Sequence, residues 1–417
     1  MTPTVGIAIV NRDGRDLLLR CLGSLEELDW PKDALSIVVV DNASTDGSIQ
    51  AIRARHPDVR VLAEDRNLGF AGGANRAMRE LRDVDYVALL NNDTVVEPDW
   101  LRPLVDVLES NPGLGAATSK ILFDGSFVEL TLDTDAAPRS RADPRPVGVC
   151  VSGVRVDGRD EWRRAQFVRG WHREELDSGM PFRWSDGHGL VRVPAGNNAE
   201  LRLDNEWQDF PLTGSTVDVI NNAGSILVEG GFGADRGFQE VDRGQYDEPD
   251  EVFAWCGASA LLRRAYIDDV GGFDHRLFLY YEDLDLAWRG RARGWRYRYV
   301  PDSVVRHVHT ASSVEGSERF DYYVERNRLV VHVKNAPAGY AARVALGALR
   351  MMLVIGRREV VRRRLFRGEP DATIVRRRLS SLAGFLALLP TALIERFRLR
   401  RRQRIPYEEQ MRWLVRL

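Results

Sequence analysis

The sequence predicts an α/β core built on a parallel sheet, interrupted by a β-sandwich and followed by a basic, amphipathic helical tail. Over the first 120 or so residues, short apolar runs alternate with helix-length segments, which is typical of a parallel sheet covered by helices. Over 124–215 the helical periodicity fades, and alternating polar and apolar residues appear between turn clusters, as in an antiparallel sandwich. Beyond residue 338, apolar residues are interleaved with arginines at helical spacing.

The first part of the chain should contain four strands and three helices. The strands are apolar, largely β-branched runs, at 5–10, 36–40, 60–63 and 86–90. The helices follow at 17–22, 49–56 and 74–81. Short polar side chains cap exposed backbone N–H groups, so Asp46, Gly47 and Ser48 are expected to open the second helix. Ligands of such sheets bind beyond the carboxyl ends of the strands, where Asp41 and the pair Asn92 and Asp93 stand.

The pattern divides the chain into two core halves, an insert and a tail. Their expected limits are 1–123 and 216–337 for the core, 124–215 for the insert and 338–417 for the tail. A chain of 417 residues is long enough for two or three domains. The insert could be a lectin-like module or an oligomer contact. Four tryptophans could offer sugar-stacking faces, although core packing is the commoner use of such residues: Trp162, Trp171, Trp184 and Trp207.

The charge is strongly polarised although the net charge is only −2. Residues 338–417 carry +13 and residues 1–337 carry −15; an acidic body without a known binding module argues against a nucleic-acid partner. Arginine triplets and apolar helix suit the surface of an anionic membrane, with a solvated or dimer-forming helix pair as the alternative. The triplets are 362–364, 376–378 and 400–402.

Two further features bear on the location of the chain. The longest uncharged run, 379–394, has 16 residues and contains Pro390, so no bilayer span is expected, because a span needs roughly 20 apolar residues. No signal peptide is expected, because the residues before the first apolar strand carry no basic leader. The three cysteines are widely spaced and predict neither a disulfide framework nor a metal site, which favours a reducing compartment.

An acidic cluster at 282–285 is the most informative motif. It places Glu282, Asp283 and Asp285 among aromatic and aliphatic residues, which is unfavourable unless the acids have a task. Mutual repulsion and partial burial raise a carboxylate pKa toward the range of a general base. The alternative is a partly structural cluster, with Asp285 paired to Arg289 one helical turn later.

Three weaker motifs suggest how a phosphate and a metal could be held. The glycine-rich turn at 67–75 opens a helix, whose N-terminus favours phosphate, but it matches neither a P-loop nor a dinucleotide fingerprint. The run at 89–94 ends a buried strand in Asp93; one carboxylate plus substrate phosphate suits Mg²⁺ or Mn²⁺. His307 and His309 are alternate residues after a strand and could supply imidazole ligands.

Taken together and in this order, the motifs resemble the inverting GT-A glycosyltransferases of family 2, especially rhamnosyltransferase-like and galactofuranosyltransferase-like members. The resemblance covers residues 4–122 and about 217–335. The segments that carry it are 38–48, 67–75, 89–94, 273–289 and 306–313.

The resemblance implies a role for each matching residue. Asp283 would be the catalytic base, with Glu282 and Asp285 in the acceptor site. The nucleotide sugar would contact Asp41, Asn67, Gly69 and Asn92. The metal, Mg²⁺ or Mn²⁺, would be held by Asp93 together with His307 or His309. In the family's metal motif a carboxylate stands where this chain has Asn91.

The implied function is metal-dependent transfer of a sugar from a nucleotide-diphosphate donor to a glycan or lipid-linked acceptor, in cell-envelope polysaccharide synthesis. By resemblance the donor is dTDP-rhamnose, with UDP-galactofuranose or another hexosyl donor as the alternative. A non-catalytic carbohydrate-binding protein is the alternative of another class. We expect a cytoplasmic protein at the inner face of the cell membrane, for which a homo-oligomer is one of the open assemblies.

Overall fold

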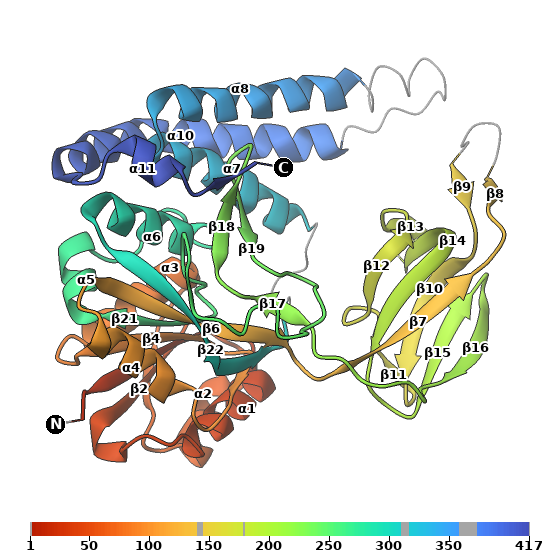
Figure 1. The fold of residues 1–417 in the computed structure, drawn as a ribbon, viewed down its shortest axis with the longest axis horizontal. Helices are drawn as coiled ribbons and strands as arrows, with labels where there is room; N and C mark the ends of the chain where they lie inside the picture. Colours follow the sequence, from red (N-terminus) through yellow and green to blue (C-terminus); the bar gives the residue numbers. More distant parts are fainter. Residues whose placement is uncertain (1, 140–144, 178–179, 310–316, 358–372, 417) are drawn as a thin grey trace. The chain divides into compact units, whose positions relative to one another are not determined.

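The computed structural model describes residues 2–139, 145–177, 180–309, 317–357 and 373–416, and the chain forms two compact units (Figure 1). The first unit contains residues 1–121, 222–236 and 246–417. The second contains 122–221 and 237–245. The insert expected over 124–215 therefore gains a second segment, 237–245, which its sequence pattern did not indicate.

The first unit is built on a mixed sheet whose strands run in the order β20-β22-β6-β21-β4-β1-β2-β3. The first strands of the chain pair in parallel, as predicted; they are β1 (Val5–Asn11), β2 (Leu35–Asp41), β3 (Arg60–Ala63) and β4 (Tyr86–Asn91). The later strands add antiparallel pairs; they are β5 (Thr94–Val96), β6 (Leu114–Phe123), β20 (Asp250–Glu251), β21 (Ser259–Arg263) and β22 (Arg296–His307). The predicted α/β core with parallel strands at the start of the chain is thus confirmed.

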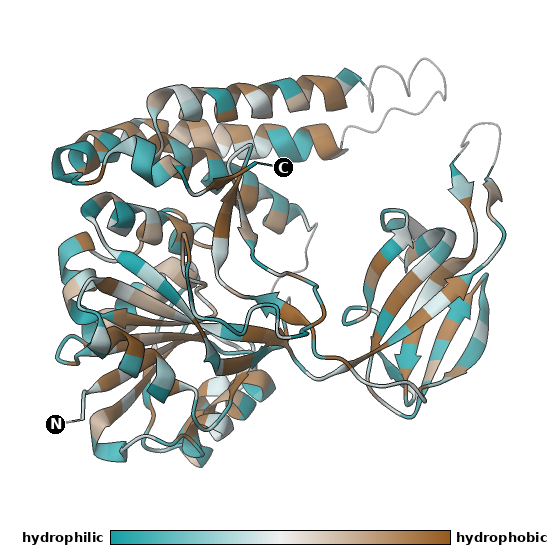
Figure 2. Cartoon of the chain, viewed as in Figure 1, coloured by the Kyte–Doolittle hydropathy of each residue, from teal (hydrophilic) through white to brown (hydrophobic). Residues whose placement is uncertain are grey.

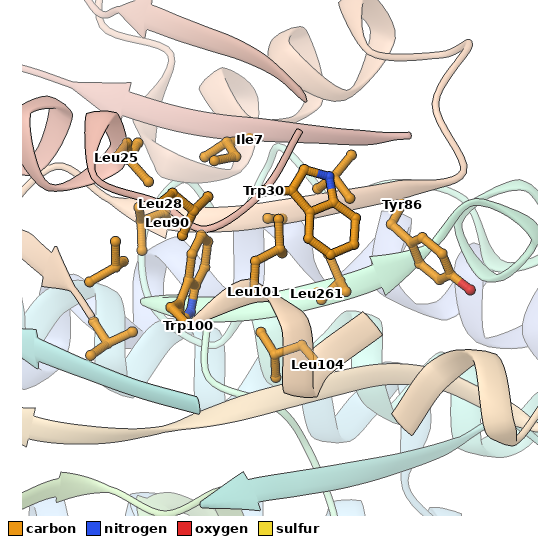
Figure 3. Packing of buried hydrophobic residues seen from close by; sticks show 14 of the residues in the cluster. Ile7, Leu25, Leu28, Trp30, Tyr86, Leu90, Trp100, Leu101, Leu104 and Leu261 are labelled. Atoms are coloured by element: carbon orange, nitrogen blue, oxygen red, sulfur yellow. The ribbon is translucent and has the colours of Figure 1, made fainter. Parts of the chain in front are cut away.

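Helices cover the sheet and close its core. Those within residues 1–121 are α1 (Arg15–Glu26), η1 (Lys32–Ala34), α2 (Ser48–Arg55), α3 (Gly69–Glu80) and α4 (Leu101–Ser110). The strands present fully buried aliphatic residues such as Ile7 and Leu90 to this layer, and Trp100 and Leu104 pack against them (Figure 3). The Trp100 indole N–H reaches two buried hydroxyls, those of Ser119 and Ser259, at 3.0 Å each. The core therefore buries a large aromatic without leaving its polar atom unsatisfied.

Two helices and a hairpin belong to the second half of the core, within residues 222–293. They are α5 (Arg264–Val270), α6 (Glu282–Arg293), β18 (Ser225–Val228) and β19 (Phe232–Asp235). The short C-terminal strand β23 (Leu414–Val415) pairs in parallel with β18. Trp288 of α6 donates to Gln410 Oε1 at 3.1 Å, so the end of the chain packs on α6.

The tail is helical, as expected. Its helices are α8 (Ala338–Ile355), α10 (Thr373–Arg402) and α11 (Tyr407–Met411), and α7 (Glu318–Asn335) comes just before it, in the second half of the core. Apolar residues recur along α8 and α10 (Figure 2). By length and composition alone, α8 and α10 are each able to cross a membrane, which the interrupted run 379–394 did not predict. The arginine triplet 362–364 lies outside the described residues.

The second unit is antiparallel, but its main sheet is not split into the two separate sheets of a sandwich. The 15-residue strand β14 pairs with β7 and β12 along its second half and with β13 and β10 near its start. Because one long strand pairs at both ends, the strands form one hydrogen-bonded sheet, and most of its buried apolar residues form one core cluster. Its strands are β7 (Phe127–Asp133), β10 (Cys150–Val156), β11 (Arg159–Asp160), β12 (Gln166–Trp171), β13 (Glu175–Asp177), β14 (Met180–Pro194), β15 (Asn198–Leu203) and β16 (Glu206–Pro211). The pair β8 (Ala137–Pro138) and β9 (Pro146–Val147) stands beside it, and β17 (Ile220–Asn222) ends the insert.

Most of the tryptophans of the insert serve packing. Trp162 and Trp171 pack against the apolar core of the insert and contact Phe167, at ring-centroid distances of 5.1 and 4.9 Å. Trp207 is 41% exposed, but the Arg155 guanidinium lies 4.2 Å from its ring centroid. The aromatic side chains of the insert are therefore mainly committed within the protein.

Candidate active site

Polar side chains at the ends of three parallel strands form a connected group. The parallel register places Asn11 of β1 beside Asp41 of β2, and Asn91 ends β4 at the same edge. Asn92 Nδ2 donates to Asn11 Oδ1 at 2.7 Å, and Asn11 Nδ2 donates to Asp41 Oδ2 at 3.0 Å. We call Asn11, Asp41, Asn92, Asp93 and His307 the strand-end cluster. The predicted convergence of Asp41 and Asn92 at one sheet edge is confirmed, whereas Asn11 was not predicted.

Asp41 is completely buried. Its other oxygen, Oδ1, accepts the backbone N–H of Ser44 at 2.8 Å, so the carboxylate holds the turn that follows β2. Ala43 in this turn has a φ of 60°, which a residue other than glycine adopts only when its surroundings impose it. Asp41 therefore shapes the turn, and its contact with a nucleotide stays a prediction.

Asp93 and His307 form the second part of the cluster. The Asp93 side chain accepts a hydrogen bond from His307 Nε2 at 3.1 Å, and both residues are at least 93% buried. Burial by itself would raise the pKa of Asp93, but the His307 charge and hydrogen bond, together with His309, outweigh it and lower that pKa. The His307 and His309 ring centroids lie 5.7 Å apart. The structure thus brings His307 to Asp93 directly and leaves His309 beside it.

The Asp93–His307 pair fits a divalent ion. Mg²⁺ is bound at about 2.0–2.1 Å in near-octahedral geometry, so two neighbouring ligands lie roughly 3 Å apart, close to the 3.1 Å between Asp93 Oδ1 and His307 Nε2. Among the described residues, no group of three acidic, histidine or cysteine side chains is arranged to hold an ion. A metal here would need further ligands from its substrate, which is the sparse ligation that Mg²⁺ favours.

The glycine-rich turn contacts protein backbone at its start. Asn67 Oδ1 accepts the Gly69 N–H at 2.8 Å, and Gly69 begins α3 with a φ of 72°. A Cβ on Gly69 would lie 2.3 Å from the carbonyl oxygen of Phe278. The absence of a side chain at Gly69 therefore lets this turn approach the segment that precedes the acidic motif.

That segment is conformationally strained. We call residues 277–283 the acidic segment. Phe278, Tyr280 and Tyr281 have φ values of 69°, 67° and 67°, and each such residue costs roughly 1–3 kcal/mol. Tyr281 is the residue from which α6 begins. Strain of this kind persists only where the surroundings impose it, and it often marks a functional site.

Asp283 lies in the first turn of α6 and is partly exposed. Oδ2 accepts the Gly257 N–H at 3.1 Å, and Oδ1 accepts the Leu284 N–H at 2.7 Å. Burial raises the pKa of Asp283; the charge of Asp235 adds to this rise, and the backbone donors oppose it. A partly exposed carboxylate with a raised pKa has the properties of a general base.

Glu282 lies beside this carboxylate in a drier setting. It is 6% exposed, and its Oε2 has no hydrogen-bond partner among the described residues. Burial and the neighbouring Asp283 charge raise the pKa of Glu282 to about 8. At neutral pH Glu282 is therefore mostly protonated, while Asp283 is the more accessible of the two acids.

Asp285 does not take part in the site, so the expectation that it lies in an acceptor site is wrong. It is 0% exposed and bonded to Arg289 Nε at 2.9 Å and to Lys334 Nζ at 2.8 Å. Burial would raise the pKa of Asp285, but these two cations outweigh it and lower that pKa. The alternative interpretation, a structural pair with Arg289 one turn later, is confirmed.

One short segment joins the acidic motif to the strand-end cluster. Gly257 donates its N–H to Asp283, and the next residue, Ala258, accepts the Asn91 N–H at 3.1 Å. Antiparallel pairing of Ser259 with Leu90 continues this contact along β21 and β4. The structure therefore brings both motifs to the same end of the sheet. Gly257 carries no sequence motif, so nothing in the pattern could have indicated its role.

Comparison with known proteins gives two family matches. "Glycosyl transferase family 2" matches residues 4–171, and "Glycosyltransferase like family 2" matches residues 237–328. Together these matches cover more than half of the chain.

Among characterised relatives, the chain is similar to the N-acetylglucosaminyl-diphospho-decaprenol L-rhamnosyltransferase of Mycobacterium tuberculosis. The two are 27% identical over 281 residues, which is 67% of this chain and 68% of the relative. It is also 30% identical over 132 residues to a probable glucomannan 4-beta-mannosyltransferase 9 of Oryza sativa, covering 29% of this chain and 25% of that protein.

Solved glycosyltransferase structures resemble the chain more distantly. One is the mannosyltransferase PcManGT of Pyrobaculum calidifontis in complex with GDP-Man and Mn²⁺, at 16% identity and a TM-score of 0.43, covering 94% of this chain and 88% of that one. Another is GalNAc-T7 with UDP, GalNAc and Mn²⁺, at 14% identity and a TM-score of 0.46, covering 95% and 58%.

Proposed function

The chain belongs to glycosyltransferase family 2, and from this premise we propose that it transfers a sugar from a nucleotide-diphosphate donor with inversion at the anomeric carbon. The observation that carries the proposal is the placement of Asp283. This partly exposed carboxylate opens α6 and is tied through Gly257 and Ala258 to the strand-end cluster. A single displacement needs a base near the attacking hydroxyl and groups that hold the leaving diphosphate nearby. Asp283 and the strand-end cluster, at one end of the sheet, suit these two tasks.

Asp283 acts as the general base in this proposal. It takes the proton of an acceptor hydroxyl as that oxygen attacks the anomeric carbon of the donor. The new C–O bond forms while the bond to the diphosphate breaks, and the nucleoside diphosphate leaves with the bonding electron pair. General-base assistance is typically worth roughly 10²–10⁴-fold in rate. The raised pKa of Asp283 increases its proton affinity. Its partial exposure leaves the carboxylate accessible to the acceptor hydroxyl.

The strand-end cluster is proposed to hold the diphosphate side of the donor. Asp93 and His307 are the residues that would hold Mg²⁺ or Mn²⁺, and a bound ion would supply positive charge to the leaving diphosphate. The Asn92–Asn11–Asp41 chain fixes the turn after β2. We propose that this turn and Asn67 contact the nucleotide. The two lie close together, because Gly69 bonds to Asn67 and also accepts a hydrogen bond from Asn42 of the turn, at 3.1 Å.

We propose that the transferred sugar is a rhamnosyl group. The mycobacterial relative is by name an L-rhamnosyltransferase acting on N-acetylglucosaminyl-diphospho-decaprenol, so dTDP-rhamnose and a lipid-diphosphate-linked sugar are the proposed donor and acceptor. Another hexosyl donor, such as UDP-galactofuranose, is the alternative. A role in cell-envelope polysaccharide synthesis follows from such an acceptor.

Substitution of the base tests the reaction. Asp283→Asn keeps the shape of the side chain and one of its two backbone hydrogen bonds, because only the amide oxygen can accept a backbone N–H, and it cannot take a proton. We expect nucleoside-diphosphate release in the presence of acceptor to fall at least 100-fold, with donor affinity within threefold of wild type, measured by calorimetry. Near-normal turnover in this variant would remove Asp283 from the reaction and the proposed mechanism with it.

We further propose that α8 and α10 lie on the cytoplasmic face of a membrane. In α10 the buried residues Ser381, Phe385 and Ala392 face the protein. Large apolar residues remain exposed along the two helices: Leu346, Leu349, Met351, Leu353, Val354, Ile374, Leu379, Leu386, Leu393, Ile394 and Phe397. An exposed apolar stripe on an arginine-rich helix suits the interface of an anionic bilayer.

Contacts of α10 with α7 favour lying on the membrane over crossing it. Arg377 and Arg378 pair with Asp321 and Glu325 of α7 at 3.2 and 3.3 Å. Arg396, near the other end of α10, donates to two backbone carbonyls at the end of α7, at 2.7 Å each. The 376–378 triplet is thus partly committed to α7, and the helix is fastened to the protein near both ends.

Vesicle flotation tests the membrane proposal. Leu386→Glu combined with Phe397→Glu places two charges on the exposed stripe, and we expect flotation with anionic vesicles to fall at least tenfold. The matched control adds the same charge at two exposed positions elsewhere, Ser110→Glu and Gln208→Glu, and should float like wild type. Equal flotation of both variants would contradict the proposal.

A further inference from the structure

Four carbonyl groups of the acidic segment accept hydrogen bonds from elsewhere in the unit. Asn327 of α7 donates from its amide nitrogen to the carbonyl oxygens of Leu277, Leu279 and Tyr280 at 2.9, 2.8 and 2.7 Å. The Phe278 carbonyl accepts the Ala71 N–H at 3.2 Å. Four consecutive carbonyl groups are therefore held by α7 and α3. The Asn327 amide, which has two N–H bonds, supplies three of these contacts, so one N–H is shared between two carbonyl oxygens.

The orientation of the Asn327 amide is fixed by its neighbour. Arg326 donates from Nε to Asn327 Oδ1 at 2.8 Å, so the amide nitrogen faces the carbonyl groups. Arg326 also donates to the carbonyls of Arg276 and Leu277, at 3.0 and 2.8 Å. Asn327 is 0% exposed, so no water replaces these bonds without opening the protein.

The opposite side of the segment is closed by the start of α3. Gly69 approaches the Phe278 carbonyl so closely that a Cβ would lie 2.3 Å from its oxygen. The left-handed residues Phe278, Tyr280 and Tyr281 are thus enclosed between α3 and α7. The last of them immediately precedes the first turn of α6, which carries Asp283.

We propose that Asn327 is a positioning residue for Asp283: by gathering the carbonyl groups of Leu277, Leu279 and Tyr280, it imposes the left-handed backbone that places the base at the reaction centre. The inference rests on the proposed function, because it gives Asn327 a role in transfer through the base. Asn327 itself touches no reacting atom. Its sequence signal is only an asparagine between two arginines, Arg326 and Arg328.

Two matched substitutions separate positioning from general stability. Asn327→Leu keeps a similar side-chain volume and removes the donors. Asn335→Leu is the control: Asn335 is buried on the same helix and donates to Asp285 Oδ1 and the Val331 carbonyl, at 2.8 and 3.1 Å. Both changes cost folding stability, which thermal unfolding measures, but only the first frees the acidic segment.

We expect Asn327→Leu and Asn335→Leu to differ in kcat but not in donor KM. With assays run well below both unfolding temperatures, Asn327→Leu should lower kcat about 100-fold, as displaced catalytic groups commonly do, and leave donor KM within threefold. Asn335→Leu should keep kcat within threefold. The fall of kcat at acidic pH that protonation of the base causes should persist in the control and flatten in Asn327→Leu.

A double substitution decides whether Asn327 acts through Asp283. If it does, Asp283→Asn with Asn327→Leu should turn over no more slowly than Asp283→Asn alone. Multiplied losses, or a kcat for Asn327→Leu within threefold of wild type, would overturn the inference. Normal turnover of Asp283→Asn would instead overturn the proposed function. Should Asn327→Leu not fold, Asn327→Ser, which keeps one donor, replaces it, and an unchanged kcat there would equally overturn the inference.

Discussion

The strand-end cluster and the acidic segment hold their side chains by opposite means. In the cluster, Asn11 and Asp41 end regular strands in parallel register, and a short chain of side-chain hydrogen bonds links them. In the acidic segment, left-handed residues such as Phe278 and Tyr281 are imposed from outside, by the donors of α3 and α7. The first arrangement comes from the sheet itself, whereas the second depends on tertiary contacts. Damage to each should therefore have a different kinetic signature.

Removal of the Asp93 charge should have the largest effect on the strand-end cluster. Asp93→Asn keeps the size of the side chain and a possible bond to His307 but leaves no carboxylate for a divalent ion. We expect kcat/KM to fall about 100-fold, or about 2.7 kcal/mol, and the half-saturating Mn²⁺ concentration to rise at least tenfold. Metal titrations of initial rate check both values.

The control for Asp93 is an exposed acid on the same stretch of chain. Asp99→Asn removes the same charge from an exposed position and should leave the metal titration unchanged. The pH dependence of kcat should also be unaffected in Asp93→Asn, because the base is intact. The distinction between the strand-end cluster and the acidic segment would be contradicted by either of two results for Asp93→Asn. One is a kcat that no longer falls at acidic pH, and the other is an unchanged half-saturating Mn²⁺ concentration.

The same distinction explains what could be predicted from the sequence. Strands and helices at the start of the chain follow from apolar periodicity, so the positions of Asp41 and Asn92 at strand ends were predicted correctly. Asn11 was missed although it also ends a strand; a polar residue at the end of β1 was the available signal.

The environment of the acidic motif could not be predicted in the same way. Burial of Asp285 depends on Lys334, 49 positions along the chain, and the shape of the segment depends on Asn327. Neither pair has a spacing that local periodicity reveals. In the insert, the 15-residue strand β14 pairs with different strands at its two ends. The alternation of polar and apolar residues alone does not indicate this pairing.

The smallest expected effect concerns Glu282, which tests the electrostatics of the acidic segment without removing the base. Burial and the Asp283 charge raise the pKa of Glu282 to about 8, with Asp285 adding to the rise. The folded chain therefore keeps a proton that the unfolded chain loses above about pH 4.5, so the stability that this proton provides is fully present at low pH and declines as pH rises toward 8.

Glu282→Gln mimics the protonated side chain at every pH. We expect turnover at pH 7 within threefold of wild type, and an unfolding temperature that rises relative to wild type between pH 5 and pH 8.5. The exposed acid Glu318 provides the control, and Glu318→Gln is measured over the same pH range. A constant difference for Glu282→Gln would mean that Glu282 is ionised beside Asp283 throughout this range, which would contradict the raised pKa of Glu282.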